Sequence, residues 1–206
     1  MGKRARKKKE RAVTAARNAP EQSSPNQAKT LPQIIDMLRE GIVIRKVLHE
    51  LARQGNEGRS IATRFAIACA LRVLPVWKAE HPTDNRPAVA IRLAMQSSRP
   101  EAIREASINA FMAHTQNKGT KWGMAAQAAA FAASAAFVKI GASCNKVSFA
   151  GKLAYHCVGA AALAVPDPKV ERDQQRRILV AMIQKDEMIQ DAMDIAERFR
   201  PFRLPA

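Results

Sequence analysis

Alanine dominates one continuous stretch of this chain, where it accounts for 16 of the 41 residues from Met124 to Ala164. Alanine has the highest helix propensity of all residues, and its side chain buries almost no surface. Helices built in this way can pack with their backbones close together, but they offer few groups that could carry out chemistry. The stretch therefore indicates a helical scaffold, and a functional site would have to be built from the neighbouring segments.

The composition is that of a globular protein with an aliphatic core. Of the 206 residues, 47% are hydrophobic and 25% are charged, which suits a soluble chain with one domain. Aromatic residues make up only 5%, so aliphatic side chains and alanine must fill the core. The 9 glycines and 11 prolines are too few for an all-β chain rich in turns. Because there is no secretory signal and the three cysteines are odd in number and widely spaced, we expect a cytoplasmic protein.

The first 29 residues form a basic segment of low hydrophobicity. The chain has a net charge of +16, and residues 1–17 alone contain eight lysines and arginines against one glutamate. This composition cannot offset the entropy of ordering, so we expect a disordered arm over residues 1–29. Such an arm could be a solvated tail, or it could bind nucleic acid, a membrane surface or an acidic protein. The cations that would bind an anion are Lys3, Arg4, Arg6, Lys7, Lys8, Lys9 and Arg11.

Residues 30–206 are predicted to form one compact all-α domain of six or seven helices. Apolar residues follow helical spacing in segments separated by glycine and proline, and sustained apolar–polar alternation is absent. A helix from Leu31 should run to a stop at Gly55, and a second should start near Ser60 and kink or end at Pro75. The further helices are expected over residues 86–96, 98–116, 121–140, 145–164 and 169–198. The later half of the last helix is acidic, through Asp186, Glu187, Asp191, Asp194 and Glu197.

Three of these helices have recognisable start signals. Thr30 and Gln33 match a capping box, in which each side chain bonds to the other residue's backbone amide. Ser98 and Glu101 repeat that spacing, and Asp84 is the expected N-cap of the helix that follows it. The stretch from Trp122 to Ile140 is apolar, but it is mostly alanine, so we expect a packed hairpin and not a membrane span.

Three segments together resemble a known family. Ala70-Leu-Arg-Val-Leu-Pro-Val-Trp77, Asp84-Asn-Arg-Pro-Ala-Val-Ala-Ile91 and Ala106-Ser-Ile-Asn-Ala-Phe-Met-Ala-His114 precede the alanine-rich hairpin. Their order is similar to that in the small all-helical immunity proteins of bacterial polymorphic toxin systems, over about residues 62–165. That family tends to place histidines in its alanine-rich helices, whereas this chain keeps only His156 there. The resemblance implies a bacterial protein that binds and neutralises a partner toxin.

The candidate partner contacts are Asp84, Arg86 and His114. Asp84 and Arg86 could present an exposed charged pair to a partner, or Asp84 could cap the helix while Arg86 pairs with a nearby carboxylate. His114 and His156 could act in binding or acid–base chemistry, or they could fill core or helix-edge positions. These alternatives stay open at the level of sequence.

Enzyme signatures are missing from the sequence. It contains no G-x-S-x-G, no G-x-x-x-x-G-K-[ST] and no H-E-x-x-H motif. No histidine has a second one three or four residues away, and no Cys-x-x-Cys completes a metal shell. We therefore predict a non-catalytic protein without metal or cofactor. Its function is expected to be toxin binding, with sequence-independent nucleic-acid binding through the basic arm as the alternative.

Overall fold

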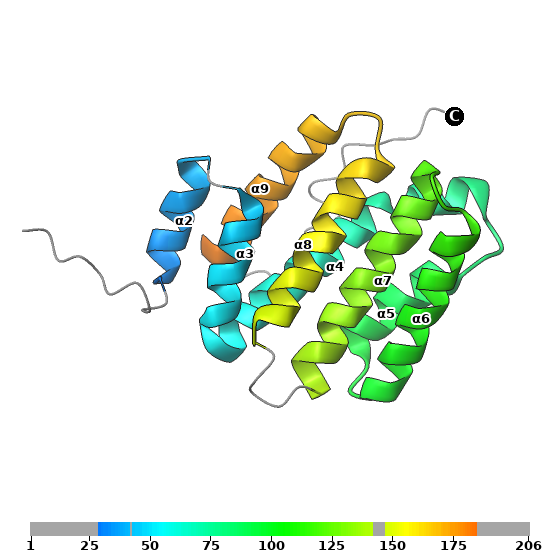
Figure 1. The fold of residues 1–206 in the computed structure, drawn as a ribbon, viewed down its shortest axis with the longest axis horizontal. Coiled ribbons are helices and arrows are strands. Elements are labelled where there is room, and N and C mark those ends of the chain that lie inside the picture. The colour runs from blue at the N-terminus through cyan, green and yellow to red at the C-terminus, as the bar shows by residue number, and fades with distance from the viewer. Residues whose placement is uncertain (1–28, 42, 142–146, 185–206) are drawn as a thin grey trace, which may run out of the picture.

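The computed structural model describes residues 29–41, 43–141 and 147–184, which form eight helices and no strand (Figure 1). The predicted all-α class is therefore confirmed. The helices are α2 (Leu31–Arg39), α3 (Ile44–Arg53), α4 (Gly55–Glu80), α5 (Arg86–Gln96), α6 (Pro100–Gln116), α7 (Lys121–Gly141), α8 (Val147–Ala164) and α9 (Pro168–Gln184). The seven cations of the arm and the acidic residues from Asp186 to Glu197 lie outside the described residues.

The helices pack in two layers. One layer runs in the order α2, α3, α8, α7 and α6, and each of these helices packs against the next (Figure 1). The other layer runs in the order α9, α4 and α5, with α4 packed against α3, α8 and α7. The alanine-rich helices α7 and α8 thus occupy the centre of the fold.

Helix α7 is enclosed on nearly every side. It packs against α8 and α6 in its own layer and against α4 and α5 in the other. All nine of its alanines are buried and together cover more than half of the helix circumference, while the remaining stripe, with Met124, Gln127, Phe131 and Ser134, is half-buried. Such a wide apolar face is typical of a central position, and small side chains let four neighbours approach the helix. The alanine-dense stretch therefore marks the centre of the core.

Two helices replace the single one expected from Leu31 toward Gly55. Helix α2 ends at Arg39 and α3 begins at Ile44, with Gly41 between them at φ +76°. Residues with side chains rarely adopt this left-handed conformation, so Gly41 marks the break. The apolar periodicity continues across this break because both helices turn an apolar face toward the core. The buried residues are Ile34 and Leu38 in α2 and Val47 and Leu51 in α3.

Helix α4 is longer at both ends than predicted. It begins at Gly55, whose φ is +79°, and it continues past Pro75 to Glu80. Pro75 lies exposed on the outer side of the helix, while Val73 and Trp77 are fully buried on either side of it. Burial of these neighbours keeps the helix continuous through the proline, so the helix does not end there, which was one of the two predicted outcomes.

The predicted start signals are partly correct. The capping box of α2 is present, with the Thr30 amide donating to Gln33 Oε1 at 2.9 Å. The one predicted for α6 is not, because Arg99 occupies the N-cap and its amide bonds to Ser97 Oγ at 3.0 Å. The proline at position 100 shifts the helix start beyond Ser98, since proline fits the first turn of a helix best.

A buried ion pair joins α4 to α9. Arg72 Nη2 and Nε donate to the two carboxylate oxygens of Glu171 at 2.7 and 3.1 Å, and both side chains are only 1% exposed. Gln175 Nε2 donates to Glu171 Oε1 at 3.3 Å and to the Val158 carbonyl at 3.2 Å. Arg72 is the one polar residue on its apolar stripe, and the structure supplies its counter-charge from 99 residues away.

Candidate functional site

The turn between α4 and α5 is fixed by a tryptophan. Trp77 is fully buried near the end of α4, and its indole Nε1 donates to the Asp84 carbonyl at 2.9 Å. The ring of His81 lies against the Trp77 ring, with centroids 4.2 Å apart. The segment from His81 to Asp84 therefore has a defined conformation.

Asp84 and Arg86 form a closed pair at the start of α5. Asp84 Oδ1 accepts the Arg86 backbone amide at 3.0 Å, and Oδ2 accepts Arg86 Nη2 at 2.7 Å. The same guanidinium donates to Gln116 Oε1 at the end of α6, also at 2.7 Å. The hydrogen bond from the Arg86 side chain is the main reason that the pKa of Asp84 lies below its ordinary value.

The pair therefore has a structural role while part of it stays exposed. Asp84 satisfies the first amide of α5, as a cap would, although the N-cap position itself belongs to Asn85 and not to the predicted Asp84. The side chains of Arg86 and Asp84 keep 34% and 23% of their surface exposed. A partner can reach this pair without disturbing the buried turn beneath it.

His114 lies inside the fold in the last turn of α6. It is 8% exposed, and its Nδ1 lies 2.9 Å from the Gly123 carbonyl at the start of α7. This hydrogen bond ties α6 to α7. The three sequence-predicted residues thus gather at one end of the molecule, because Arg86 bonds to Gln116, two residues after His114. His156, by contrast, is exposed on α8 and stacks on Phe131 at 5.3 Å.

An exposed apolar stripe on α6 was not predicted from the sequence. Its residues are Ile108, Phe111 and Met112, which are 51%, 44% and 50% exposed. They stand three and four positions apart and so share one face of the helix, opposite the buried Ala106, Ala110 and Ala113. The sequence of this helix shows two apolar faces, one of alanines and one of larger side chains. It does not show which of the two faces is covered by a neighbouring helix.

A shallow groove of about 420 Å³ lies between α5 and α6 beside this stripe. Its lining includes Arg86 and Val89 of α5 and Glu105 and Asn109 of α6. Glu105 and Asn109 neighbour Ile108 and Met112 at helical spacing, so the groove and the stripe form one continuous surface. We call this surface the α5–α6 edge. It combines a charged cluster, a groove and exposed apolar side chains.

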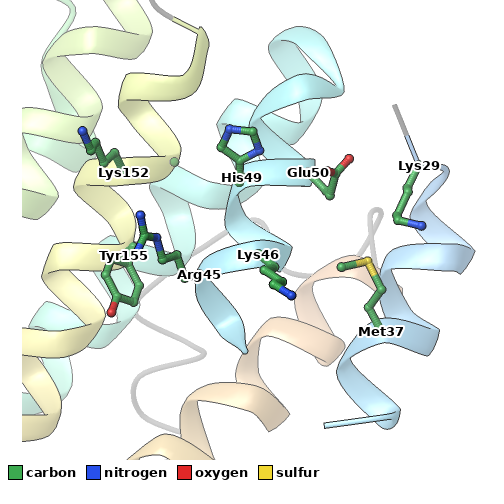
Figure 2. A pocket seen from close by; sticks show the side chains of 9 residues that line it. Lys29, Met37, Arg45, Lys46, His49, Glu50, Lys152 and Tyr155 are labelled. Atoms are coloured by element: carbon green, nitrogen blue, oxygen red, sulfur yellow. The ribbon is translucent and has the colours of Figure 1, made fainter. Parts of the chain in front are cut away.

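A second, larger hollow of about 700 Å³ lies between α2, α3 and α8 (Figure 2). Lys29 and Met37 come from the α2 side, Lys152 and Tyr155 come from α8, and α3 contributes most of the remaining lining (Figure 2). The α3 residues are Arg45, Lys46, His49 and Glu50. We call this feature the basic hollow. Its cations are spread over three segments, so the sequence alone could not bring them together.

The close contact of α3 and α8 at the basic hollow depends on a glycine. A Cβ at Gly151 would stand 2.7 Å from the Leu48 carbonyl oxygen and 3.1 Å from the Ala52 Cβ. The absence of a side chain therefore lets the two helices approach until α8 nearly touches the α3 backbone. This approach brings Lys152 and Tyr155 beside the cations of α3.

The charges in the basic hollow are unbalanced. Lys29, Arg45, Lys46 and Lys152 form no ion pair with any other described residue. Arg45 instead lies over the Tyr155 ring, 5.6 Å from its centroid. Glu50 is the one carboxylate of the lining, and its Oε1 lies 3.5 Å from Arg53. Like charges gathered in this way repel one another and attract an anion.

The remaining reactive groups are buried or dispersed. Cys69 and Cys157 are fully buried free thiols, and this burial raises the pKa of both. Cys157 Sγ donates to the Ala66 carbonyl at 3.1 Å. Across residues 29–41, 43–141 and 147–184, no three histidine, cysteine or acidic side chains lie close enough together to hold a metal ion.

Two helices have the length and composition of membrane spans. These are Gly55–Glu80 and the Lys121–Ile140 part of α7, and 67% and 61% of their most apolar stretches is buried inside the fold. Mostly buried core helices pass the same test, so these two helices give only weak support for a membrane.

Comparison of the chain with protein-family models, with curated proteins and with solved structures gives no match.

Proposed function

We propose that this chain is an immunity-like protein that binds a partner toxin and neutralises it by covering part of its surface. One observation carries the proposal, namely the exposed apolar stripe of α6 beside the Asp84–Arg86–Gln116 cluster. The resemblance over residues 62–165 points to the same function, and that stretch includes the whole α5–α6 edge. We expect the binding to take place in a bacterial cytoplasm and to involve no catalytic step.

The residue types at the α5–α6 edge suit a protein interface. Aromatic residues, methionine and arginine are enriched at the cores of such interfaces, and here Phe111, Met112 and Arg86 lie on one surface. A stable complex buries about 800 Å² on each partner, so the interface would have to extend from the stripe across the groove to the Asp84–Arg86 cluster. The described residues carry 21 lysines and arginines against 11 acidic residues, so the complementary toxin surface should be acidic around an apolar centre.

The test begins with a partner captured by the full-length chain from nuclease-treated lysate and then purified. The triple variant Ile108→Ser/Phe111→Ser/Met112→Ser should bind this partner about tenfold more weakly or worse, a loss of about 1.4 kcal/mol or more. Co-expression with the triple variant should also fail to protect cells from the partner.

The matched control is Phe149→Ser/Leu163→Ser, which removes exposed apolar side chains from α8. It should bind and protect like the unchanged chain. Equal binding by the stripe variant and the control would refute the proposed surface. A partner that binds in equal stoichiometry but harms no cell would refute the immunity-like function.

A second candidate function is nucleic-acid binding through the N-terminal arm. The observation that favours it is that the arm joins the domain at Lys29, on the rim of the basic hollow. Arm and hollow would then offer one continuous basic surface to a phosphate backbone. Replacement of the seven arm cations by glutamine in the full-length chain tests this function. Binding to a labelled DNA duplex should fall, and its dependence on salt should become less steep, by about 0.9 in log–log slope for each phosphate that is no longer neutralised.

A further inference from the structure

The basic hollow carries four cations that form no ion pair with another described residue, beside the single carboxylate of Glu50. Lys29, Arg45, Lys46 and Lys152 come from three separate segments of the chain and line one space. All four side chains are exposed to solvent, and together they surround a concavity of about 700 Å³. Bringing like charges together in a concave site has an energetic cost, and an anion in the site would relieve it.

The size and walls of the hollow narrow the class of anion. Ligand pockets in proteins commonly have volumes of about 300–1,000 Å³, so this hollow exceeds what a single inorganic ion needs. Tyr155 and Met37 add an aromatic and an apolar wall beside the cations (Figure 2). Arg45 is already held over the Tyr155 ring, which places a guanidinium next to a planar aromatic surface. Such a pairing suits a ligand that has both a phosphate group and a planar ring.

We propose that the basic hollow between α2, α3 and α8 is a binding site for a nucleotide, either free or within a single strand. The phosphates would lie among Lys29, Lys46 and Lys152, and the base would lie against Tyr155. The site lies on different helices from the α5–α6 edge, so it does not depend on the toxin-binding function. It differs from arm binding because it needs the folded contact of α3 and α8 at Gly151.

The chain offers a direct spectroscopic reporter of the proposed site. Tyr155 is its only tyrosine, so ¹³C-labelling of tyrosine rings places one NMR signal inside the hollow. Anions that bind the arm alone would leave this signal unchanged. The full-length labelled protein is titrated separately with ATP, pyrophosphate, adenosine and a single-stranded oligonucleotide.

The proposal predicts a saturable shift of the Tyr155 signal with ATP, with the oligonucleotide or with both. Whichever of the two binds more tightly identifies the source of the nucleotide. Lys46→Gln/Lys152→Gln should weaken that binding by about tenfold or more, because each lysine loses a charge-assisted contact to phosphate. The control Lys118→Gln/Lys121→Gln removes two exposed lysines, one from the turn after α6 and one from the first residue of α7, and should leave the affinity unchanged.

Three results would overturn the proposal. The first is no saturable shift with either ATP or the oligonucleotide. The second is equal affinity of the two double variants, which would place the binding outside the hollow. The third is adenosine or pyrophosphate binding as tightly as ATP, which would remove the requirement for phosphate and base together. Arg45→Lys keeps the charge but loses the planar contact, so it should weaken ATP binding more than pyrophosphate binding.

Discussion

The centre of the molecule and its α2–α3 side use opposite kinds of residue. In the centre, α4, α7 and α8 meet through alanine and other small or apolar side chains, and the buried Arg72 of α4 is paired with Glu171 of α9. On the α2–α3 side, long cationic chains surround a hollow and form no ion pair with another described residue. Helix α8 belongs to both regions, so stability and the proposed ligand binding are carried by different faces of the fold and not by different helices. Substitutions should separate the two, with large stability effects in the centre and small ones at the hollow.

The largest effect should come from breaking the buried ion pair. Glu171→Leu leaves the Arg72 guanidinium buried without its carboxylate, and such a loss destabilises a protein by about 3–5 kcal/mol. Urea unfolding followed by circular dichroism measures this change. The double variant Arg72→Met/Glu171→Leu removes both charges and should recover most of the lost stability. A double variant as unstable as the single one would mean that packing, and not charge, makes Glu171 important.

An intermediate effect is expected at the contact of α3 and α8. Gly151→Ala forces a Cβ against the Leu48 carbonyl, and overpacking of this kind has a cost of about 1–3 kcal/mol. Gly159, on the same helix, has open space within 4 Å of the position that a methyl group would take, so Gly159→Ala should stabilise by about 0.5–1 kcal/mol through helix propensity. Thermal unfolding of the two variants side by side provides the measurement. Equal shifts in the same direction would show that the close approach at Gly151 is unimportant.

A smaller effect, with a defined pH dependence, is expected at the turn before α5. Asp84→Asn removes the carboxylate that accepts the Arg86 amide and side chain, and the loss of such a capping interaction has a cost of about 1 kcal/mol. Because the folded-state pKa of Asp84 is lowered, its contribution is present above the unfolded value near 3.8 and disappears as the pH falls through the folded value. The stability difference between Asp84→Asn and the unchanged chain should therefore vanish in acid. A difference that does not shrink as the pH is lowered would argue against the ion pair as its source.

The smallest effect on stability should come from the basic hollow. Lys46→Gln/Lys152→Gln should change the free energy of unfolding by no more than about 0.5 kcal/mol, as for most surface substitutions. At low salt its sign should be stabilising, since two repelling charges are removed, and salt should erase the gain. Chemical unfolding at two salt concentrations measures both. A large destabilisation would contradict the separation of stability from ligand selection.

Much of the fold could be predicted from local pattern. The helix from Arg86 to Gln96 has the predicted bounds, and α6 ends at Gln116 as expected, because proline and capping residues act within a few positions of a helix end. The two main errors have different causes. At Gly41 the continuing apolar periodicity hid a local break signal, whereas at Pro75 the burial of neighbouring residues overrides a local one.

The candidate sites could be predicted less well. The cluster of Asp84 and Arg86 could be identified from the local sequence because the two residues are close together at an expected helix start. The basic hollow was not, since Lys29, Arg45 and Lys152 come together only when α8 packs on α3. The carboxylate that pairs with Arg72 lies 99 positions away, which is beyond the reach of any local pattern.

The distance along the chain between Arg72 and Glu171 has a consequence during protein synthesis. Arg72 is made 99 residues before its carboxylate, which at about 5–20 residues per second corresponds to a delay of about 5–20 s. During that interval the helices up to α8 can already associate, but Arg72 still lacks the carboxylate of Glu171. Packing of α9 supplies this carboxylate. Completion of this part of the core therefore has to wait for α9, and a nascent polypeptide that stops before Glu171 leaves the α9-facing side of α4 uncovered.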